Sequence, residues 1–411
     1  MRYKIFIVCL FTGLLYACKD NDSNEDQTPY FGIEAKELDQ SFVSAYDLKY
    51  VTVKTNQEFT AIPADPWCTV EVVDDKIDNL KIIVTENDGT NDRNTQITVQ
   101  AAGFENFTIN VSQRGLPYIV AEETDVLITD GNLEFTLNIS SNISYAIELP
   151  EWITEKVGQT NTFVAKALAP GERSGQIVIK STEVGVQERT SIPVKQETLN
   201  TYKIATWDFE DAFNLGKATL GKNLEMVFNT ASYPNAAFTQ VEGPTAENKA
   251  VRIPLNCHFL ADLALGPKQG EDYISEYTLF FEFKFPEVGK FYSFYQTNLT
   301  NTGDAEIFVR SSNPATIGVG ATGYHGSGKV LPGVWNRLYL SVKPGDFKFF
   351  LNGEQIGSST TSDTRFRIDL NGVILCGGPW TKTDDNEFDI AQISVWNGAL
   401  TLNQVKELEG N

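Results

Sequence analysis

Two segments of this 411-residue sequence carry the same series of motifs, and this duplication constrains the fold more than any other feature. Each copy has a tryptophan shortly after a proline, Trp67 in one and Trp152 in the other. An acidic residue followed by Arg-x-x-Gln-Ile comes later, at residues 92–97 and 172–177, and each copy closes on Val-x-Gln, at 111–113 and 194–196. Repeats of this size are independent domains rather than units of a solenoid.

Within each copy, apolar and polar residues alternate in short runs, such as residues 80–84, 107–111 and 135–139. Alternation places the apolar side chains on one face of an extended chain. Such runs separated by turns are typical of an Ig-like β-sandwich of about 80–100 residues. Trp67 and Trp152 each open a strand after a turn, and we expect both rings to fill their cores.

The two copies resemble the BACON domain, an Ig-like module of Bacteroides-group proteins, in the tryptophan, the Arg-x-x-Gln-Ile step and the closing Val-x-Gln. The resemblance predicts sandwiches over residues 30–115 and 116–198. The family's name implies carbohydrate binding. Neither copy contains an obvious cluster of exposed aromatic residues, so we interpret both as spacers.

A longer unit, residues 201–411, opens with Trp-Asp-Phe-Glu at 207–210. One of its strands ends at Asn352-Gly353, which favours a hairpin because both residues tolerate positive φ. The last strand reads Phe-Asp-Ile-Ala-Gln-Ile-Ser-Val-Trp at 388–396, and Ala-Leu-Thr follows at 399–401. Thr401 is a good N-cap for a short closing helix, in which Val405 and Leu408 are spaced for one buried face.

These motifs, in this order, resemble a LamG-type, concanavalin-like jelly roll. The chain is therefore predicted to be all-β, with two Ig-like sandwiches followed by a jelly-roll sandwich. The resemblance implies that the last domain binds a glycan. It also implies a structural calcium ion held by Glu210, Asp211 and Asp389, and carboxylates suit calcium chemically.

Aromatic residues in the C-terminal unit are the candidate ligand-binding groups, since an exposed ring offers an apolar face with a polar edge. Trp380 lies in a loop with no strand partner nearby, and Tyr324 and His325 lie in a glycine-rich segment. Tyr292 and Tyr295 are expected to point to opposite faces of one strand. The alternative for each ring is packing beneath its own loop.

Catalysis is the less favoured reading. Glu387 and Asp389 resemble part of the Glu-x-Asp-x-x-Glu motif of laminarinase-like glycosidases, but Gln392 replaces the third acid. A retaining glycosidase needs two carboxylates about 5–5.5 Å apart. Only two histidines are present, so a zinc site or a catalytic triad is hard to assemble. Residues 318–323 match Gly-x-Gly-x-x-Gly, but no helix is expected after them to face a phosphate.

The start of the chain reads as an export signal. Residues 1–17 have a basic start and a short apolar run, and Leu-Tyr-Ala-Cys at 15–18 resembles a lipobox, which makes Cys18 the lipid-bearing residue. Residues 18–29 are polar and charged and predict a flexible tether. We expect a lipid anchor in the outer membrane, facing outward. The alternatives are an ordinary signal cut near Ala17 and a simple spacer.

Charge excludes one class of partner. The formal net charge of −21 repels phosphate backbones, so we expect no nucleic-acid partner. The sequence therefore favours a surface lipoprotein that binds a glycan without hydrolysing it, beside other polysaccharide-utilisation proteins. The alternatives are a structural or adhesive protein that binds another protein, and a laminarinase-like glycosidase.

Overall fold

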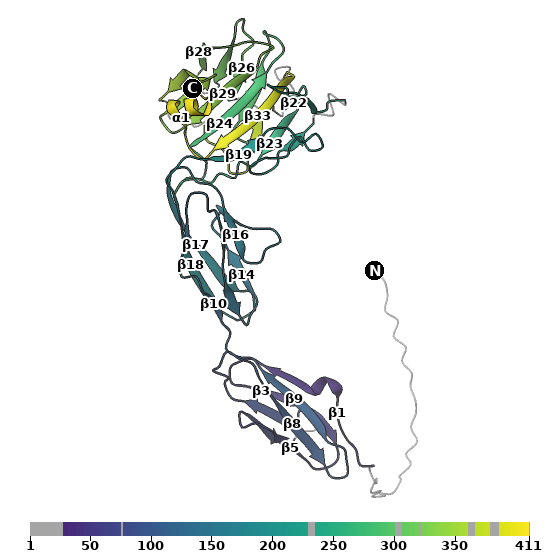
Figure 1. The fold of residues 1–411 in the computed structure, drawn as a ribbon. Coiled ribbons are helices and arrows are strands. Elements are labelled where there is room, and N and C mark those ends of the chain that lie inside the picture. Colours follow the sequence, from purple (N-terminus) through teal and green to yellow (C-terminus); the bar gives the residue numbers. More distant parts are fainter. Residues whose placement is uncertain are drawn as a thin grey trace, which may run out of the picture. The chain divides into compact units, whose positions relative to one another are not determined.

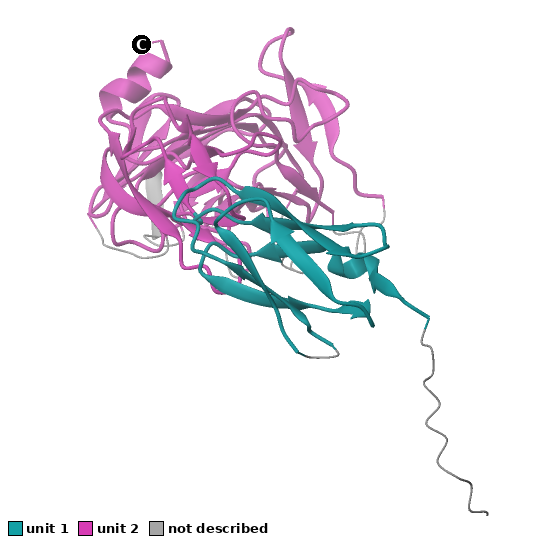
Figure 2. Ribbon diagram, turned by 90° about the horizontal axis from the view of Figure 1, so that it is seen from below, with its two compact units in different colours: residues 1–117 teal, residues 118–411 magenta. Residues whose placement is uncertain are grey.

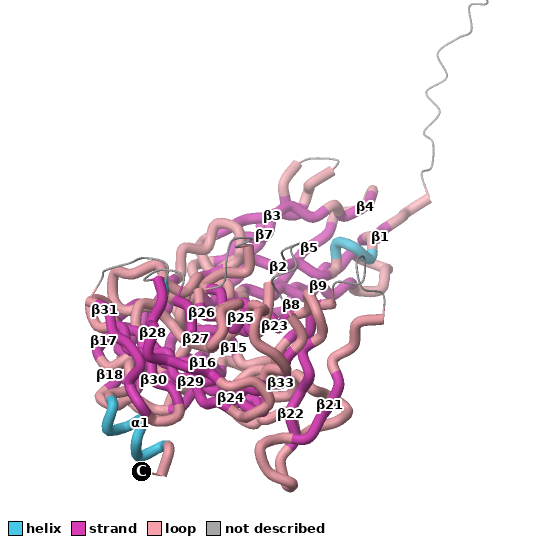
Figure 3. Tube along the Cα trace, turned by 90° about the horizontal axis from the view of Figure 1, so that it is seen from above, coloured by secondary structure: helices cyan, strands magenta, loops and turns pink. Residues whose placement is uncertain are grey.

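The structure is a computed structural model that describes residues 28–74, 77–228, 235–300, 306–319, 323–360, 366–378 and 386–410, with backbone alone at 323–327. Within these ranges the fold is all-β, as predicted, apart from a 3-10 helix at 35–37 and an α-helix at 402–408 (Figure 3). The chain forms two compact units, residues 1–117 and 118–411 (Figure 2). No helix in the described ranges has the length and apolarity needed to span a membrane.

The first unit is an Ig-like sandwich (Figure 1). Its core is made by apolar residues from both main sheets, among them Val51, Ile82 and Ile109, and Trp67 packs against this core. A four-stranded sheet has the order β2 (Asp39–Phe42), β9 (Phe107–Gln113), β8 (Arg93–Ala101), β5 (Phe59–Pro63). A three-stranded sheet has the order β3 (Asp47–Val51), β7 (Leu80–Val84), β6 (Cys68–Val72), and β1 (Phe31–Ile33) pairs with β4 (Val53–Thr55) beside the 3-10 helix η1 (Ala35–Glu37).

The second sandwich repeats this topology strand for strand at the start of the second unit. Its four-stranded sheet is β11 (Val126–Ile128), β18 (Arg189–Thr198), β17 (Gly171–Ser181), β14 (Tyr145–Glu148). Its three-stranded sheet is β12 (Glu134–Thr136), β16 (Thr162–Ala165), β15 (Ile153–Glu155), and β10 (Ile119–Ala121) pairs with β13 (Ile139–Ser141). Strand β2 pairs in parallel with β9 in the first copy, and β11 pairs in parallel with β18 in the second. This shared parallel pair supports the same topology for the two sandwiches.

The repeated sequence motifs meet in space in both copies. In the first copy, the guanidinium carbon of Arg93 lies 4.4 Å from the centre of the Trp67 ring, and Arg93 Nε donates to Gln113 Oε1 at 2.9 Å. In the second copy, Arg173 lies 4.4 Å from the Trp152 ring and donates to Gln196 Oε1 at 2.9 Å. The motif therefore encodes a cation–π contact capped by a buried glutamine.

The remaining residues form a jelly roll of two packed sheets. One sheet has the order β21 (Thr239–Glu242), β22 (Lys249–Ile253), β33 (Phe388–Trp396), β24 (Tyr277–Lys284), β29 (Asn336–Val342), β30 (Phe347–Leu351), β31 (Glu354–Ser359), with β19 (Lys203–Trp207) also paired to β33. The other has the order β20 (Glu225–Val227), β23 (His258–Ala261), β32 (Val373–Leu375), β25 (Tyr292–Gln296), β26 (Ile307–Val309), β27 (Ala315–Val319), β28 (Gly323–Val330). One apolar core lies between them, rich in buried phenylalanine.

Two local predictions for this domain are confirmed and one is partly wrong. Asn352 and Gly353 form the hairpin turn with φ of 52° and 84°. Thr401 caps helix α1 (Leu402–Leu408), accepting from the Gln404 backbone in a capping box. Val405 is buried, but Leu408 is 48% exposed, because this helix packs only one turn against the outer face of the larger sheet.

Contacts join the second sandwich to the jelly roll within the second unit. Arg173 Nη1 donates to the carbonyl oxygen of Pro267 at 2.8 Å. Ala167 pairs in parallel with Leu265, and Asn397 Nδ2 donates to the carbonyl oxygen of Leu168 at 2.6 Å. Buried side chains and paired backbone therefore continue across this junction.

Candidate functional site

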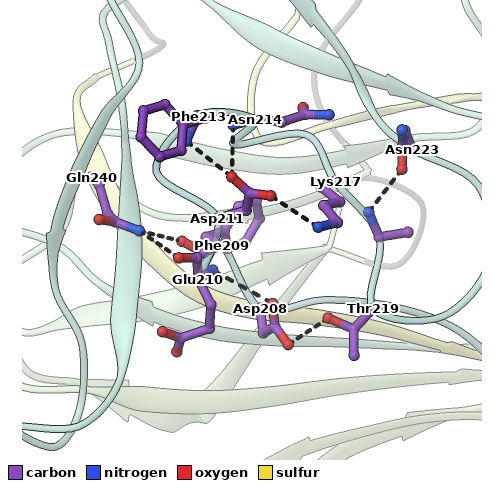
Figure 4. A network of polar contacts seen from close by, with 11 residues as sticks. Asp208, Phe209, Glu210, Asp211, Phe213, Asn214, Lys217, Thr219, Asn223 and Gln240 are labelled. Atoms are coloured by element: carbon purple, nitrogen blue, oxygen red, sulfur yellow. Dashed lines mark hydrogen bonds and ion pairs between the residues drawn. The ribbon is translucent and has the colours of Figure 1, made fainter.

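The loop that opens the jelly roll is held by its own hydrogen bonds (Figure 4). Trp207 is fully buried, and its Nε1 donates to the carbonyl oxygen of Lys222 at 2.9 Å. Phe209 is also buried and adopts a φ of 58°, which turns the chain so that Glu210 and Asp211 lie outside the core. Gln240 Nε2 donates to the carbonyl oxygens of both Phe209 and Glu210, at 2.9 and 3.1 Å.

The three carboxylates predicted to bind calcium each have a different partner. Glu210 Oε1 accepts from the Lys249 backbone at 3.0 Å. Asp211 pairs with Lys217 at 2.9 Å, and this hydrogen bond lowers the pKa of Asp211. Asp389 is buried against Arg252, with Nε–Oδ1 at 2.7 Å, and Lys284 lies 3.5 Å from its other oxygen.

This arrangement does not fit a calcium site shared by the three acids. Among the described residues, no three acidic, histidine or cysteine side chains converge as a metal would require. The Gln240 amide also occupies the position from which a cation would coordinate the two loop carbonyls. Calcium in this domain stays a prediction, without support from these side chains.

Tyr292 and Tyr295 lie in the core, contrary to the expected exposure of a ligand-binding ring. Both are fully buried. Tyr292 donates to the Glu287 carbonyl oxygen at 2.9 Å, and the Tyr295 and Tyr277 hydroxyls lie 2.9 Å apart. The expectation of opposite faces is wrong because a bulge follows Ser293, which lets Tyr295 face the core as Tyr292 does.

The other predicted ligand residues are placed only in part. The backbone of Tyr324 and His325 belongs to strand β28, and Tyr324 pairs with Gly318. The described residues of the Gly-x-Gly-x-x-Gly match, Gly318, Val319 and Gly323, thus lie on antiparallel strands. Trp380 and Cys18 lie outside the described residues.

A polar cleft of about 660 Å³ opens between the second sandwich and the jelly roll, and sequence reasoning missed it. Its volume falls in the range of small-molecule sites. Tyr273 and Arg367 both line it, and the Arg367 guanidinium carbon lies 4.1 Å from the centroid of the Tyr273 ring. Backbone pairing between Ile274 and Ile368, with N–O distances of 2.9 and 3.0 Å, fixes this pair side by side.

Around this pair the cleft is lined by groups that donate and accept hydrogen bonds. The second sandwich contributes Glu151 and Lys166. The jelly roll adds further polar side chains, Asp272, Asn298, Asp369 and Asn371. Across the described part of the chain, the side chains of Lys166, Asp272 and Tyr273 make no hydrogen bond or ion pair with another residue. The cleft therefore combines a half-buried aromatic ring with polar groups that are available to a ligand.

Sequence reasoning missed this site because its parts are distant in sequence. Tyr273 and Arg367 lie in different loops, and the strand pairs that bring them together are visible only in the fold. The one available signal was an aromatic residue within the polar segment 267–273.

Comparisons with known proteins agree with this architecture. Residues 265–406 match a family model described as the "Concanavalin A-like lectin/glucanases superfamily". Residues 52–114 match the BACON model, described as "Putative binding domain, N-terminal". The chain thus contains a BACON domain at 52–114 and a concanavalin-like domain at 265–406, while a second BACON domain over 116–198 stays a prediction. A search of curated proteins found no match.

Solved structures resemble parts of the chain. Domain 4 of AbnA, an extracellular arabinanase from Geobacillus stearothermophilus in complex with arabinotriose, is 17% identical with a TM-score of 0.35, over 51% of this chain and 98% of that one. A Bacteroides ovatus GH5 xyloglucanase is 17% identical with a TM-score of 0.19, over 25% of this chain and 27% of that one. Trypanosoma rangeli sialidase is 11% identical with a TM-score of 0.37, over 50% and 32%. The chain therefore spans about a third or less of the last two proteins.

Proposed function

We propose that this protein binds carbohydrate without hydrolysing it, and that the cleft around Tyr273 and Arg367 holds the sugar. The observation that carries the proposal is the half-buried ring beside polar groups that have no partner among the described residues. A sugar offers an apolar ring face and a rim of hydroxyls, which such a site matches. The concanavalin-like match over 265–406 is in keeping with this.

Binding without hydrolysis rests on the state of the motif that resembles a glycosidase. Asp389 is 4% exposed and accepts two hydrogen bonds from Arg252. Glu387 lies 3.6 Å from the same guanidinium. Asp389 is itself buried, so breaking its pair with Arg252 would leave its charge without compensation, which makes this carboxylate a poor nucleophile or general acid.

The expected site of action is the cell surface. The export signal expected at 1–17, the tether at 18–29 and a lipid on Cys18 together would hold the binding domains outside the outer membrane, beside other proteins that handle polysaccharide. Metabolic labelling with a palmitate analogue tests the anchor. The label should be lost in Cys18→Ala, and retention of the label in that variant contradicts the anchor.

Titration of the purified chain against arabinan and xyloglucan, followed by a wider glycan array, tests the binding. Tyr273→Ala should weaken binding at least tenfold, because it removes the stacking face. Tyr30→Ala is the matched control, since Tyr30 is 51% exposed and lies in the other unit. If Tyr273→Ala and wild type bind with equal affinity, this cleft is not the binding site. If the protein releases reducing sugar from any of these polysaccharides, the proposal of binding without hydrolysis is wrong.

A further inference from the structure

Tyr273 lies at the end of a loop that runs from the junction of the second sandwich and the jelly roll into the cleft. We name residues 266–273 the Tyr273 loop. At its start, the Gly266 amide donates to the carbonyl oxygen of Ala167 in the second sandwich at 2.8 Å. At its end, the chain continues into the pairing of Ile274 with Ile368. Both ends of the loop are therefore fixed, and the contacts between them decide where the Tyr273 ring lies.

The Tyr273 loop takes no part in the apolar core. None of residues 266–273, all of which the structure describes, belongs to that core, although Leu265 and Ile274 on either side do. Gly270 adopts a φ of 80°, and a Cβ at this position would meet no neighbouring atom. A glycine in such a position restrains the backbone very little. The position of the loop therefore depends on polar contacts rather than on burial.

Two adjacent residues of strand β17 hold the first half of the loop. Gln269 Oε1 accepts a hydrogen bond from the Ser174 backbone amide at 2.7 Å. The neighbouring Arg173 donates from Nη1 to the carbonyl oxygen of Pro267 at 2.8 Å. Both contacts join the second sandwich to a segment of the jelly roll. The second sandwich therefore determines the position of the loop on the N-terminal side of Gly270.

The jelly roll itself holds other parts of the same loop. Lys268 Nζ donates to the carboxylate of Glu276 at 2.6 Å, and Glu276 is 5% exposed. Glu271 accepts from the Ser275 hydroxyl, also at 2.6 Å. Hydrogen bonds with a charged partner are stronger than neutral ones. The loop is thus bound to two domains at once, and Gln269 is the side chain through which it reaches the second sandwich.

We propose that Gln269 and Arg173 are positioning residues of the cleft, through which the second sandwich holds the Tyr273 ring ready to stack on a sugar. This inference rests on the function proposed above for the cleft. A ring that is already in place binds more tightly, because the ligand does not have to order the loop. The second sandwich then sets the affinity of a site whose aromatic ring belongs to the next domain, which is more than the role of a spacer.

Gln269 offers the sharper test, since its side chain lies on the surface and its loss should leave the melting temperature nearly unchanged. Gln269→Ala in the full chain removes the acceptor for the Ser174 amide. Gln269→Glu keeps an acceptor oxygen there and should restore the behaviour of the wild type. Gln187→Ala is the matched control, because Gln187 is exposed and lies beyond the other end of strand β17.

The first measurement needs no ligand. With 3-fluorotyrosine in place of Tyr273 alone, the fluorine resonance reports the surroundings of this ring. In Gln269→Ala the resonance should broaden or move toward that of free 3-fluorotyrosine, whereas Gln269→Glu and Gln187→Ala should leave it in place. The same resonance in Gln269→Ala and wild type would overturn the proposal.

The second measurement is the dissociation constant for arabinan and for xyloglucan by calorimetric titration. Gln269→Ala should raise it about fivefold, as expected for the loss of one hydrogen bond. Gln269→Glu and Gln187→Ala should bind as the wild type does. If the resonance of residue 273 moves but the affinity of Gln269→Ala stays the same, the positioning role is wrong. If the wild type binds no glycan, the proposed function fails, and the fluorine resonance alone decides whether Gln269 positions Tyr273.

Discussion

Arg173 stacks on Trp152 at 4.4 Å and, from the same guanidinium, donates to the Pro267 carbonyl oxygen of the next domain. Its counterpart Arg93 makes the equivalent stack on Trp67, but its outer nitrogen bonds the carbonyl oxygens of Thr85 and Glu86 within its own sandwich. One motif therefore closes a domain in the first copy and joins two domains in the second.

Arg173→Ala should lower the free energy of unfolding by about 3 kcal/mol, because it leaves the buried Gln196 and two backbone carbonyls without their charged donor. Arg93→Ala is the matched control and should cost about 1 kcal/mol, since its site is more exposed. Urea titration of both variants measures the difference. Burial lowers the pKa of Arg173 to about 9, so the residue is charged at neutral pH. Equal losses in the two variants contradict the joining role.

Gly266→Ala should disturb the same junction. A methyl group at Gly266 would lie 2.1 Å from Arg173 Nη1, which is closer than any real contact, so the guanidinium must move. We expect a loss of about 1–3 kcal/mol, typical of overpacking. Gly270→Ala, where a Cβ meets nothing but φ is 80°, controls for backbone strain alone. A smaller loss at 266 than at 270 argues against a tight junction.

Asp389→Ala should destabilise the jelly roll by about 1–3 kcal/mol, because it removes two charge-assisted hydrogen bonds with Arg252, although Arg252 and Lys284 both keep contact with water. Glu387→Ala should cost less than 1 kcal/mol, as its side chain is 54% exposed. Thermal melts with calcium and with EDTA belong to the same experiment. The ion pairs predict the same melting temperature in both, whereas a rise with calcium that Asp389→Ala abolishes would support the metal instead.

His258 should make stability depend on pH. It is 5% exposed, its Nδ1 has no hydrogen-bond partner in the described structure, and burial lowers its pKa to about 4 from 6.5. Between pH 6.5 and 4, His258 is protonated in the unfolded chain but stays neutral in the folded chain. The free energy of unfolding therefore decreases as the pH falls through that window. The contribution is about 3 kcal/mol at most.

Comparison of wild type with His258→Gln separates the effect of His258 on stability from that of the carboxylates, because both proteins contain the same carboxylates. Urea midpoints at pH 7 and pH 4.5 should differ more in wild type than in the variant. The same pH dependence in both proteins would show that His258 is not responsible.

Local signals in the sequence predicted much of the fold. The Asn352–Gly353 turn and the Thr401 cap depend on residues within a few positions, and alternation in the repeats depends only on the strand period. The duplication also located Trp67, Arg93 and Gln113. Their mutual contact could not be read from the sequence, because it joins three strands whose register is set by tertiary pairing.

The candidate site was less predictable for the same reason. Strict alternation separates Tyr292 from Tyr295, but the bulge after Ser293 changes the count by one and buries both rings. Tyr273 meets Arg367 only because Ile274 pairs with Ile368.

The buried contacts around Arg173 also determine how the molecule bears a load. If the cleft holds a polymer as proposed, a force on that polymer would act on the jelly roll and pass through the paired backbone at Ala167 and Leu265 into the second sandwich. At these contacts the two domains are joined directly by backbone pairing. The force would therefore act on the Ig-like domain parallel to the paired backbone. The paired backbone would keep the two domains in a fixed arrangement under load. Separation of the two domains would begin with the loss of this pairing.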